Sequence, residues 1–370
     1  MAEPLKNSFG PDVPSLIAEM FSQIAPNFDH TAFVADCLDG YEDLELMARG
    51  RQIAAVLAAH LPTDRAEALK LVTSALAVQV DNQDMGNMKA FLYMPHSYFI
   101  ADCGLDHFEL AMTAQYEMTK LFSAEFSIRP YLEQHRDLTL SRLRDWTADP
   151  SEHVRRLVSE GTRPRLPWAG RLREFQANPT PVLDLLELLR HDRSEYVRRS
   201  VANNLNDIAK DHPQVVVDVA TRWWTDSNAD EQRMIRHGLR SLIKAGHPGA
   251  LAVLGFGSDS PARVVEVTTT PPQVQIGEKV RVEVVVDNPS ADTAGALVDI
   301  VVNFVKANGS TSPKVFKGAE TQLAPGESKT IGKTISLKQH TTRTHYQGRH
   351  IVEVQINGQL VPGCTFELIQ

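Results

Sequence analysis

The spacing of apolar residues over the first 257 positions is that of α-helices. Between Glu195 and Asp207, apolar side chains recur at Val197, Val201 and Leu205, with polar residues between them. Such a stripe predicts an amphipathic helix that packs one face against a core. The first 118 residues have the same periodicity in stretches separated by Pro, Asn and Asp: Val13 to Ile24, Thr31 to Cys37, Tyr41 to Leu61 and Arg65 to Val78. An aromatic segment from Phe91 to Phe99 is interrupted by Pro95 and predicts a core-filling turn between helix pairs.

The helical pattern also repeats along the chain. The segment that begins at Glu152 with Glu-His-Val-Arg-Arg returns at Glu195 as Glu-Tyr-Val-Arg-Arg, 43 residues later. Asp and Ser precede both helices, in Ala148–Ser151 and His191–Ser194, where their side chains can cap the first turn. Helix pairs that repeat every 35 to 45 residues or so are typical of a HEAT-like α-solenoid.

After Pro261 the apolar residues alternate with a period of two. Val280, Val282, Val284 and Val286 are separated by charged or β-branched residues, and similar alternations follow to the C-terminus. About seven short strands separated by turn signals predict an immunoglobulin-like β-sandwich without its disulfide. The predicted fold is therefore mainly α: a HEAT-like α-solenoid over residues 1–257, followed by a C-terminal immunoglobulin-like β-sandwich over residues 262–370.

Charge is distributed unevenly over the 370 residues. The net charge of −8 argues against wholesale wrapping in nucleic acid, but a field depends on where charges lie. The first hundred residues are acidic and poor in Arg, whereas the Arg clusters lie between about Lys120 and Lys244. This asymmetry favours a local basic surface of the kind that binds nucleic acid.

Cysteine usage and apolar runs limit the other classes of function. The three cysteines, Cys37, Cys103 and Cys364, are far apart and predict reduced thiols in a cytoplasmic protein. We expect no signal peptide, because the N-terminal residues lack an apolar stretch, and no membrane span, because no apolar run approaches about 18 residues. The sequence has no recognisable metal-ligand cluster, phosphate-cradling Gly loop or Ser/His/Asp spacing, so we expect no metal and no cofactor.

The most specific chemistry lies between Glu152 and Trp168. Arg156, Glu160 and Arg163 fall on one polar face of the predicted helix, which breaks at Pro164 before a turn that carries Arg165 and Trp168. A carboxylate among arginines, beside an aromatic ring, suits a site that holds a phosphate backbone and stabilises a cation. The alternative of ordinary surface ion pairs stays open for this face, and for Glu125 with Arg129 at i, i+4.

Three long segments resemble the AlkC branch of the HEAT-like repeat DNA glycosylases, which act in alkylation repair: Ser123–Leu132, His153–Trp168 and Tyr196–Pro213. The resemblance covers roughly residues 4 to 256, and the predicted sandwich resembles an appendage of some members. It implies base excision repair of duplex DNA, by hydrolysis of the N-glycosidic bond of cationic alkylated bases such as 3-methyladenine. It also implies that the base is not turned into a pocket. The implied partner is double-stranded DNA containing alkylated bases, bound by a monomer without contact with a membrane.

The chemistry of a cationic lesion agrees with the residues of these segments. A base that already carries a positive charge leaves as a neutral molecule and needs no strong general acid. The sugar becomes oxocarbenium-like, so carboxylates, an aromatic face and a positioned water help the reaction. The expected catalytic residues are Glu125, Glu160, Trp168 and Asp207. For Trp168, which follows Pro167 in a break between helices, the alternative is a core plug.

The expected DNA contacts are mostly arginines, because a guanidinium suits bidentate binding of phosphate. The candidates are Arg129, Arg156, Arg163, Arg165, Arg199, Arg236 and Arg240, with Asn203 as a further donor and with Arg343 and Arg349 in the basic loop His340–Arg349. Two other functions stay open, a non-catalytic HEAT-repeat scaffold and a DNA-structure-binding protein without hydrolysis. The carboxylates favour the enzyme, since acidic groups in a phosphate-binding face repel the ligand unless a cation forms there.

Overall fold

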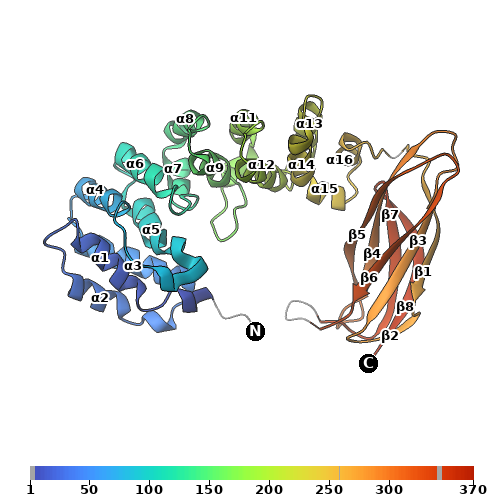
Figure 1. Cartoon of the computed structure of the whole chain (residues 1–370), viewed down its shortest axis with the longest axis horizontal. Coiled ribbons are helices and arrows are strands. Elements are labelled where there is room, and N and C mark those ends of the chain that lie inside the picture. Colours follow the sequence, from blue (N-terminus) through green and yellow to red (C-terminus); the bar gives the residue numbers. More distant parts are fainter. Residues whose placement is uncertain (1–4, 258, 340–343) are drawn as a thin grey trace. The chain divides into compact units, whose positions relative to one another are not determined.

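The computed structural model describes residues 5–257, 259–339 and 344–370, which form helices and then strands (Figure 1). The last helix ends at Val253 and the first strand begins at Arg263, so the predicted change from helices to strands is confirmed. The chain divides into two compact units, one that ends at Asp211 and one that begins at His212. The second unit therefore combines the last helices with the strands, and the predicted domain limits of 1–257 and 262–370 stay a prediction.

The first unit consists of α-helices and short 3-10 helices. Each predicted stretch before Val78 contains a helix, and the long one from Tyr41 to Leu61 is divided at Leu44 and Glu45. No helix among the described residues is long and apolar enough to cross a membrane. The α-helices are α1 Val13–Ser22, α2 His30–Leu38, α3 Leu46–His60, α4 Arg65–Ala75, α5 Met94–Cys103, α6 Phe108–Met118, α7 Ile128–Gln134, α8 Arg136–Trp146, α9 Glu152–Gly161, α10 Arg173–Ala177, α11 Thr180–Leu189 and α12 Glu195–Ile208. The 3-10 helices are η1 Leu5–Ser8, η2 Tyr41–Asp43 and η3 Gln83–Tyr93.

The prediction of a turn around Pro95 is wrong. Pro95 is the second residue of α5, where a missing backbone N–H breaks no intrahelical hydrogen bond. Proline therefore starts this helix instead of interrupting it. Every residue from Met94 to Ala101 is buried, so α5 is surrounded by the rest of the unit.

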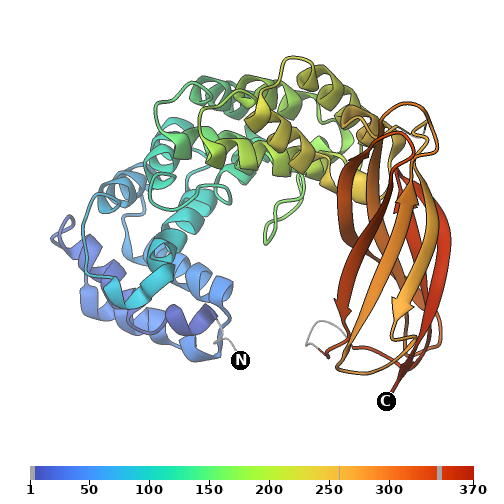
Figure 2. The ribbon, with the colours of Figure 1, turned by 45° about the vertical axis from the view of Figure 1, so that its right-hand side comes forward.

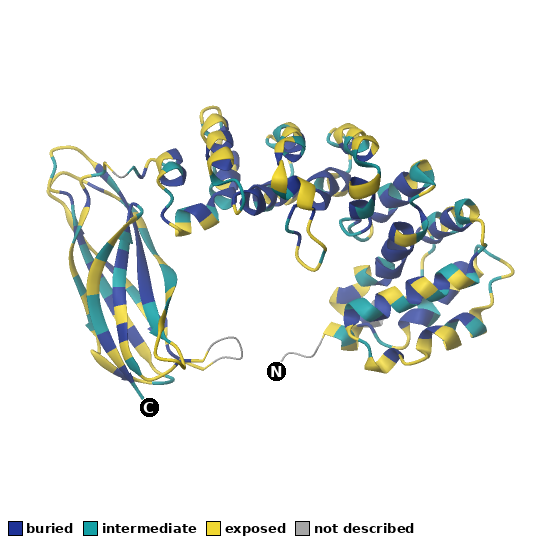
Figure 3. Cartoon of the chain, turned by 180° about the vertical axis from the view of Figure 1, so that it is seen from behind, coloured by how far each residue is buried: buried dark blue, intermediate teal, exposed yellow. Residues whose placement is uncertain are grey.

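The repeated segments form α9 and α12, which pack against each other. Val154, Leu157 and Val158 of α9 are buried, as are the predicted apolar residues of α12. Figure 3 shows that the helices carry buried and exposed residues on different faces. The helices pair as the repeat predicts, whereas the assignment as a HEAT-like solenoid stays a prediction.

The turns before these two helices differ from the prediction in one respect. The side chains of Ser151 and Ser194 make no capping hydrogen bond. Instead Asp149 and Asp192 each accept a 2.8 Å hydrogen bond from the backbone N–H two residues later. Buried Arg155 of α9 donates to both oxygens of Asp192, at 2.6 and 3.0 Å, and so connects the two repeats.

The second unit begins with α13 Pro213–Trp224, α14 Ala229–Gly238, α15 Arg240–Lys244 and α16 Pro248–Val253. Its strands are β1 Arg263–Thr270, β2 Gln273–Gln275, β3 Lys279–Asp287, β4 Ala294–Val305, β5 Thr311–Leu323, β6 Ser328–Ser336, β7 Gly348–Ile356 and β8 Gln359–Ile369. They form a three-stranded sheet, β1-β3-β6, and a five-stranded sheet, β2-β8-β7-β4-β5. The alternating valines of β3 and the apolar residues of β4, β6, β7 and β8 share one core, as expected of two packed sheets.

The last helices lie beside the strands within this unit (Figure 2), and α16 packs against strand β4. Leu251 and Phe256 form a buried cluster with Leu297 of β4. Gly246, at φ +72°, lies so close to Gly358 that a Cβ would approach the Gly358 carbonyl oxygen to 2.9 Å. The helices from Pro213 onward and the strands thus share a tightly packed contact.

Candidate active site

A pocket of about 250 Å³ in the first unit brings most of the predicted catalytic residues together. Glu125, Glu160 and Trp168 line it, and Arg163 lies between Glu160 and the fourth candidate, Asp207. The remaining wall is mainly apolar and comes from segments far apart in the sequence: Met47, Phe91, Met94, Phe122, Ser123, Phe126, Leu166 and Pro167. The lining therefore combines charged groups with an apolar, partly aromatic surface.

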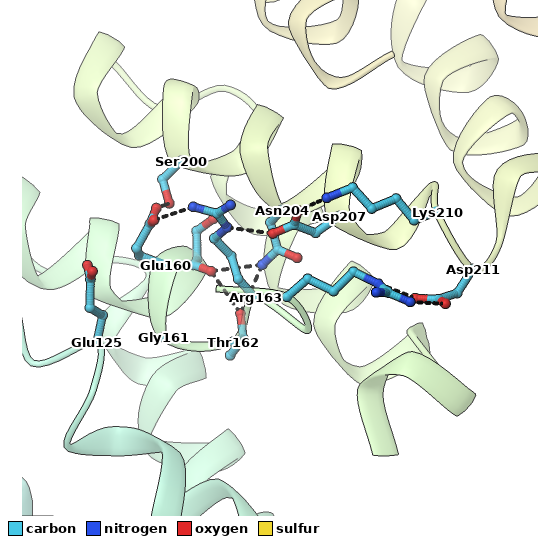
Figure 4. A network of polar contacts seen from close by, with 12 residues as sticks. Glu125, Glu160, Gly161, Thr162, Arg163, Ser200, Asn204, Asp207, Lys210 and Asp211 are labelled. Carbon is cyan, nitrogen blue, oxygen red and sulfur yellow. Dashed lines mark hydrogen bonds and ion pairs between the residues drawn. The ribbon is translucent and has the colours of Figure 1, made fainter. Parts of the chain in front are cut away.

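Glu160, Arg163 and Asp207 form a buried ion network between α9 and α12 (Figure 4). Arg163 donates from Nη1 to Glu160 Oε1 at 2.6 Å and from Nε to Asp207 Oδ2 at 2.8 Å. The exposed fraction of the whole residue is 5% for Glu160, 8% for Arg163 and 2% for Asp207. The alternative of ordinary surface ion pairs is therefore wrong for Glu160 and Arg163, because both are buried where α12 packs against α9.

The remaining oxygens of the two carboxylates are also bonded. Ser200 donates to Glu160 Oε2 at 2.6 Å, and Lys210 donates to Asp207 Oδ1 at 2.9 Å. Burial opposes the charge on Arg163, but Glu160 and Asp207 together raise its pKa. Desolvated charges in such a network depend on one another, and removal of one partner of a buried pair typically costs about 3–5 kcal/mol.

Glu125 is the carboxylate with an oxygen still available. Ser123 and Arg156 both bind its Oε2, at 2.8 and 3.1 Å, whereas Oε1 accepts no hydrogen bond from the described residues. Its side chain is 15% exposed, against 7% for Glu160 and 3% for Asp207. Burial raises the pKa of Glu125, and Arg156 opposes that effect. The alternative of an ion pair with Arg129 is wrong, since the partner of Glu125 is Arg156.

Trp168 lies in the loop of residues 162–172, which joins α9 to α10 and projects from the helices (Figures 1 and 2). Trp168 is 66% exposed, so the alternative of a core plug is wrong. Its backbone has φ +64°, which is unfavourable for a bulky residue and costs on the order of 1–3 kcal/mol. Such strain persists only where the surrounding structure holds it, and it is typical of functional sites.

The predicted phosphate contacts fall into different environments. The placement of Arg129 argues against its predicted role, because its side chain is buried and donates to the carbonyls of Gly161, Arg163 and Gly170. Burial lowers the pKa of Arg129 to about 10, which still leaves it charged at neutral pH. The buried ion pairs of Arg163 likewise argue against a direct contact of that residue with phosphate.

Two further arginines of the first unit have intramolecular partners. Arg156 is half-buried, binds Ser123 and Glu125, and lies 4.9 Å from the ring centre of Tyr196. Arg165 donates two hydrogen bonds to Asp211, at 2.9 and 2.6 Å. The contacts of Arg156 and Arg165 with DNA that the sequence suggested stay predictions.

Arg199 and Asn203 lie on α12, where Arg199 is exposed and Asn203 half-buried. The second unit contains Arg236, which pairs with Glu320, half-buried Arg240, and exposed Arg349 on β7. Arg343 lies outside the described residues. The DNA contacts of all these residues stay predictions. Among them, Arg199 and Asn203 belong to the unit that contains the pocket.

Several residues of the site were missed by the sequence analysis. Ser200 stands where the first repeat has buried Leu157, so a polar residue at a core position was the available signal. Buried Asn204 donates to the Ser159 carbonyl at 2.8 Å and to Thr162 Oγ1 at 3.2 Å. The apolar wall from Met47 and Phe91 had no such signal, because only the tertiary structure brings those residues to the carboxylates.

Comparison with known proteins shows the family to which this chain belongs. Residues 122–242 match the model of the family described as DNA alkylation repair enzyme, and residues 263–370 match the YhaZ C-terminal Ig-like domain. The uncharacterised protein YhaZ of Bacillus subtilis (strain 168) is 32% identical over 98% of this chain and 99% of its own length. The structure of the alkylpurine DNA glycosylase AlkC of Pseudomonas fluorescens, bound to DNA containing an abasic site analogue, is 34% identical over the whole of both chains, with a TM-score of 0.90. The chain therefore belongs to the AlkC-type proteins of the DNA alkylation repair family, with an immunoglobulin-like domain at its C-terminus.

Proposed function

We propose that this protein is a DNA glycosylase that hydrolyses the N-glycosidic bond of alkylated purines. The observation that carries the proposal is the pocket at which Glu125, Glu160 and exposed Trp168 meet. All three belong to the segment that matches the DNA alkylation repair model. The similarity to an alkylpurine glycosylase over the full chain supports the same activity.

The water is held by Glu125 in this proposal. Its Oε1 is the carboxylate oxygen at the pocket without a donor among the described residues, so it can accept a hydrogen bond from water. Glu160 is bonded at both oxygens and acts through its charge. A carboxylate 4 Å from a sugar cation contributes about 4 kcal/mol at an effective dielectric constant of 20.

Trp168, which also lines the pocket, stabilises the positive charge through its ring in this proposal. An indole face attracts a cation by about 0.5–2 kcal/mol, depending on how far both are desolvated. The exposed position of Trp168 leaves its ring accessible to a lesion or its sugar.

The substrate in this proposal is duplex DNA with a cationic lesion of the 3-methyladenine type, bound by a monomer. The polar groups at the pocket, Ser123, Glu125, Glu160 and Arg163, are largely bonded to one another. These groups are therefore poorly placed to recognise the edge of a base by hydrogen bonding. In this proposal the N-glycosidic bond is cleaved without flipping of the base into the pocket. Selection then depends on the charge of the lesion, because a cationic base leaves without protonation.

The decisive experiment is single-turnover release of bases from alkylated DNA. The parent protein is expected to release 3-methyladenine and to leave uracil in place even at enzyme excess. Glu125→Gln should abolish release and retain binding, whereas Glu109→Gln, which changes an exposed carboxylate on α6, should behave as the parent.

The other outcomes identify the alternative functions. Binding of duplex DNA without release by the parent protein would favour a DNA-structure-binding protein. Neither binding nor release would favour a scaffold. Efficient excision of uracil would contradict selection by charge.

A further inference from the structure

The loop of residues 162–172 supplies Leu166, Pro167 and Trp168 to the pocket. Leu166 is buried, whereas Pro167 and Trp168 at the tip are exposed. The tip itself has one weak internal hydrogen bond, from Ala169 N to the Leu166 carbonyl at 3.4 Å. The position of the Trp168 ring therefore depends on what holds the two ends of the loop.

One guanidinium binds both ends of this loop. Arg129, on α7, donates from Nη1 to the carbonyls of Gly161 at 3.2 Å and Arg163 at 2.9 Å, where the loop begins. Its Nη2 donates to the carbonyl of Gly170, where the loop returns. Arg129 as a whole is 5% exposed, so these bonds are largely shielded from water.

The geometry of arginine explains why a single residue can do this. The N–H groups of a guanidinium lie in one plane and point in fixed directions, so two nitrogens reach two strands of backbone at once. Gly161 is the last residue of α9, and its carbonyl has no partner within the helix. Arg129 thus supplies a hydrogen-bond donor to the last carbonyl of α9 and also fixes the distance between the two ends of the loop.

An ion pair holds the loop at one further point. Arg165 donates to both oxygens of Asp211, at 2.9 and 2.6 Å. It lies on the outgoing side of the loop, whereas the returning side is held by the bond from Arg129 to Gly170 and by the burial of Leu172.

We infer that Arg129 is a positioning residue that acts through Trp168, by clamping the loop so that the indole stands at the pocket with its strained backbone. The inference rests on the catalytic role of Trp168 in the proposed function. Misplacement of a catalytic group by about 1 Å can slow a reaction by about 100-fold. Lysine retains the charge of Arg129 but has one nitrogen and cannot bridge both ends of the loop.

The kinetic test is a double-mutant cycle in single-turnover base release. Arg129→Lys is expected to slow release at least 10-fold while duplex binding changes less than 3-fold. In a Trp168→Ala background the same substitution should have almost no further effect, because its target is gone. Additive effects of the two substitutions would overturn the inference, as would a normal rate for either single variant. Arg142→Lys, at a half-buried arginine paired with Glu109, is the matched control and should match the parent.

A second measurement tests the clamp without any activity. Amide hydrogen exchange in residues 164–171 should be faster in Arg129→Lys than in the parent, while exchange in α12 stays the same. Unchanged exchange in the loop would overturn the clamp. Faster exchange in the loop of a protein that releases no base would instead support the clamp and contradict the proposed glycosylase activity. Faster exchange throughout the unit would indicate general destabilisation and would also overturn the inference.

Discussion

Asp207→Ala tests whether the buried ion network supports the fold as well as the chemistry. Asp207 is 2% exposed and accepts hydrogen bonds from Arg163 and from Lys210. Without it, Arg163 keeps Glu160 as its carboxylate partner but remains in the same buried position. We expect a clear loss of stability in addition to any loss of rate.

The magnitude follows from the burial of the pair. Removal of one partner of a buried ion pair costs about 3–5 kcal/mol, and the remaining bond to Glu160 favours the lower end. For a unit of about 200 residues, each kcal/mol lowers Tm by roughly 2–4 °C, so about 3 kcal/mol corresponds to roughly 6–12 °C. Lys210→Ala removes the more exposed partner, with 44% of its side chain accessible, and should cost about 0–1 kcal/mol.

Thermal unfolding followed by circular dichroism, with both variants beside the parent, measures the difference. Single-turnover rates are then compared at a temperature at which every variant is folded. If the Tm of Asp207→Ala lies within about 2 °C of that of Lys210→Ala, the network does not carry the stability assigned to it. A normal rate in folded Asp207→Ala would separately remove Asp207 from the catalytic residues.

Three further predictions concern pH, salt and the contact between the last helices and the strands. Burial raises the pKa of Glu125, so the rate of base release should begin to fall, as the pH is lowered, at a higher pH than an ordinary glutamate would give. Ser123→Ala removes a hydrogen bond that lowers this pKa, so the pH–rate profile of the variant should show the fall at a still higher pH. The logarithm of the association constant for duplex DNA should fall with the logarithm of the salt concentration, with a slope of about −0.9 per contacted phosphate. Binding titrations should give a shallower slope for Arg199→Ala, and an unchanged slope would exclude exposed Arg199 as a phosphate contact. A chain that ends at Gly257 loses Leu297 and exposes Leu251 and Phe256, so limited proteolysis should cut its last helices faster than those of the full chain, and equal cleavage rates would contradict this.

The candidate catalytic residues could be predicted where they lie close together in one segment of the sequence. Glu160, Arg163 and Trp168 stand close together in the sequence, and the repeat 43 residues later placed Asp207 on an equivalent helix. The environment of these residues was not predictable. A period of 3.6 residues separates polar from apolar faces, but it does not show that a second helix will cover the polar one. Arg129 illustrates the same limit, since a charged residue in the basic region proved to be a buried clamp for a loop.

The sequence by itself determined the order of helices and strands, the change of periodicity near Pro261 and the chemical types available for a site. These properties depend on neighbours in the chain, because the periods of 3.6 and 2 follow from backbone geometry. Only the tertiary structure decided which charges are buried, which oxygen of Glu125 is open and where Trp168 points. The apolar wall shows the same dependence, since Met47 and Phe91 reach Glu160 only through the packing of distant helices. Burial and pairing depend on contacts between residues distant in the chain, and desolvation makes those contacts decide the role of each charge.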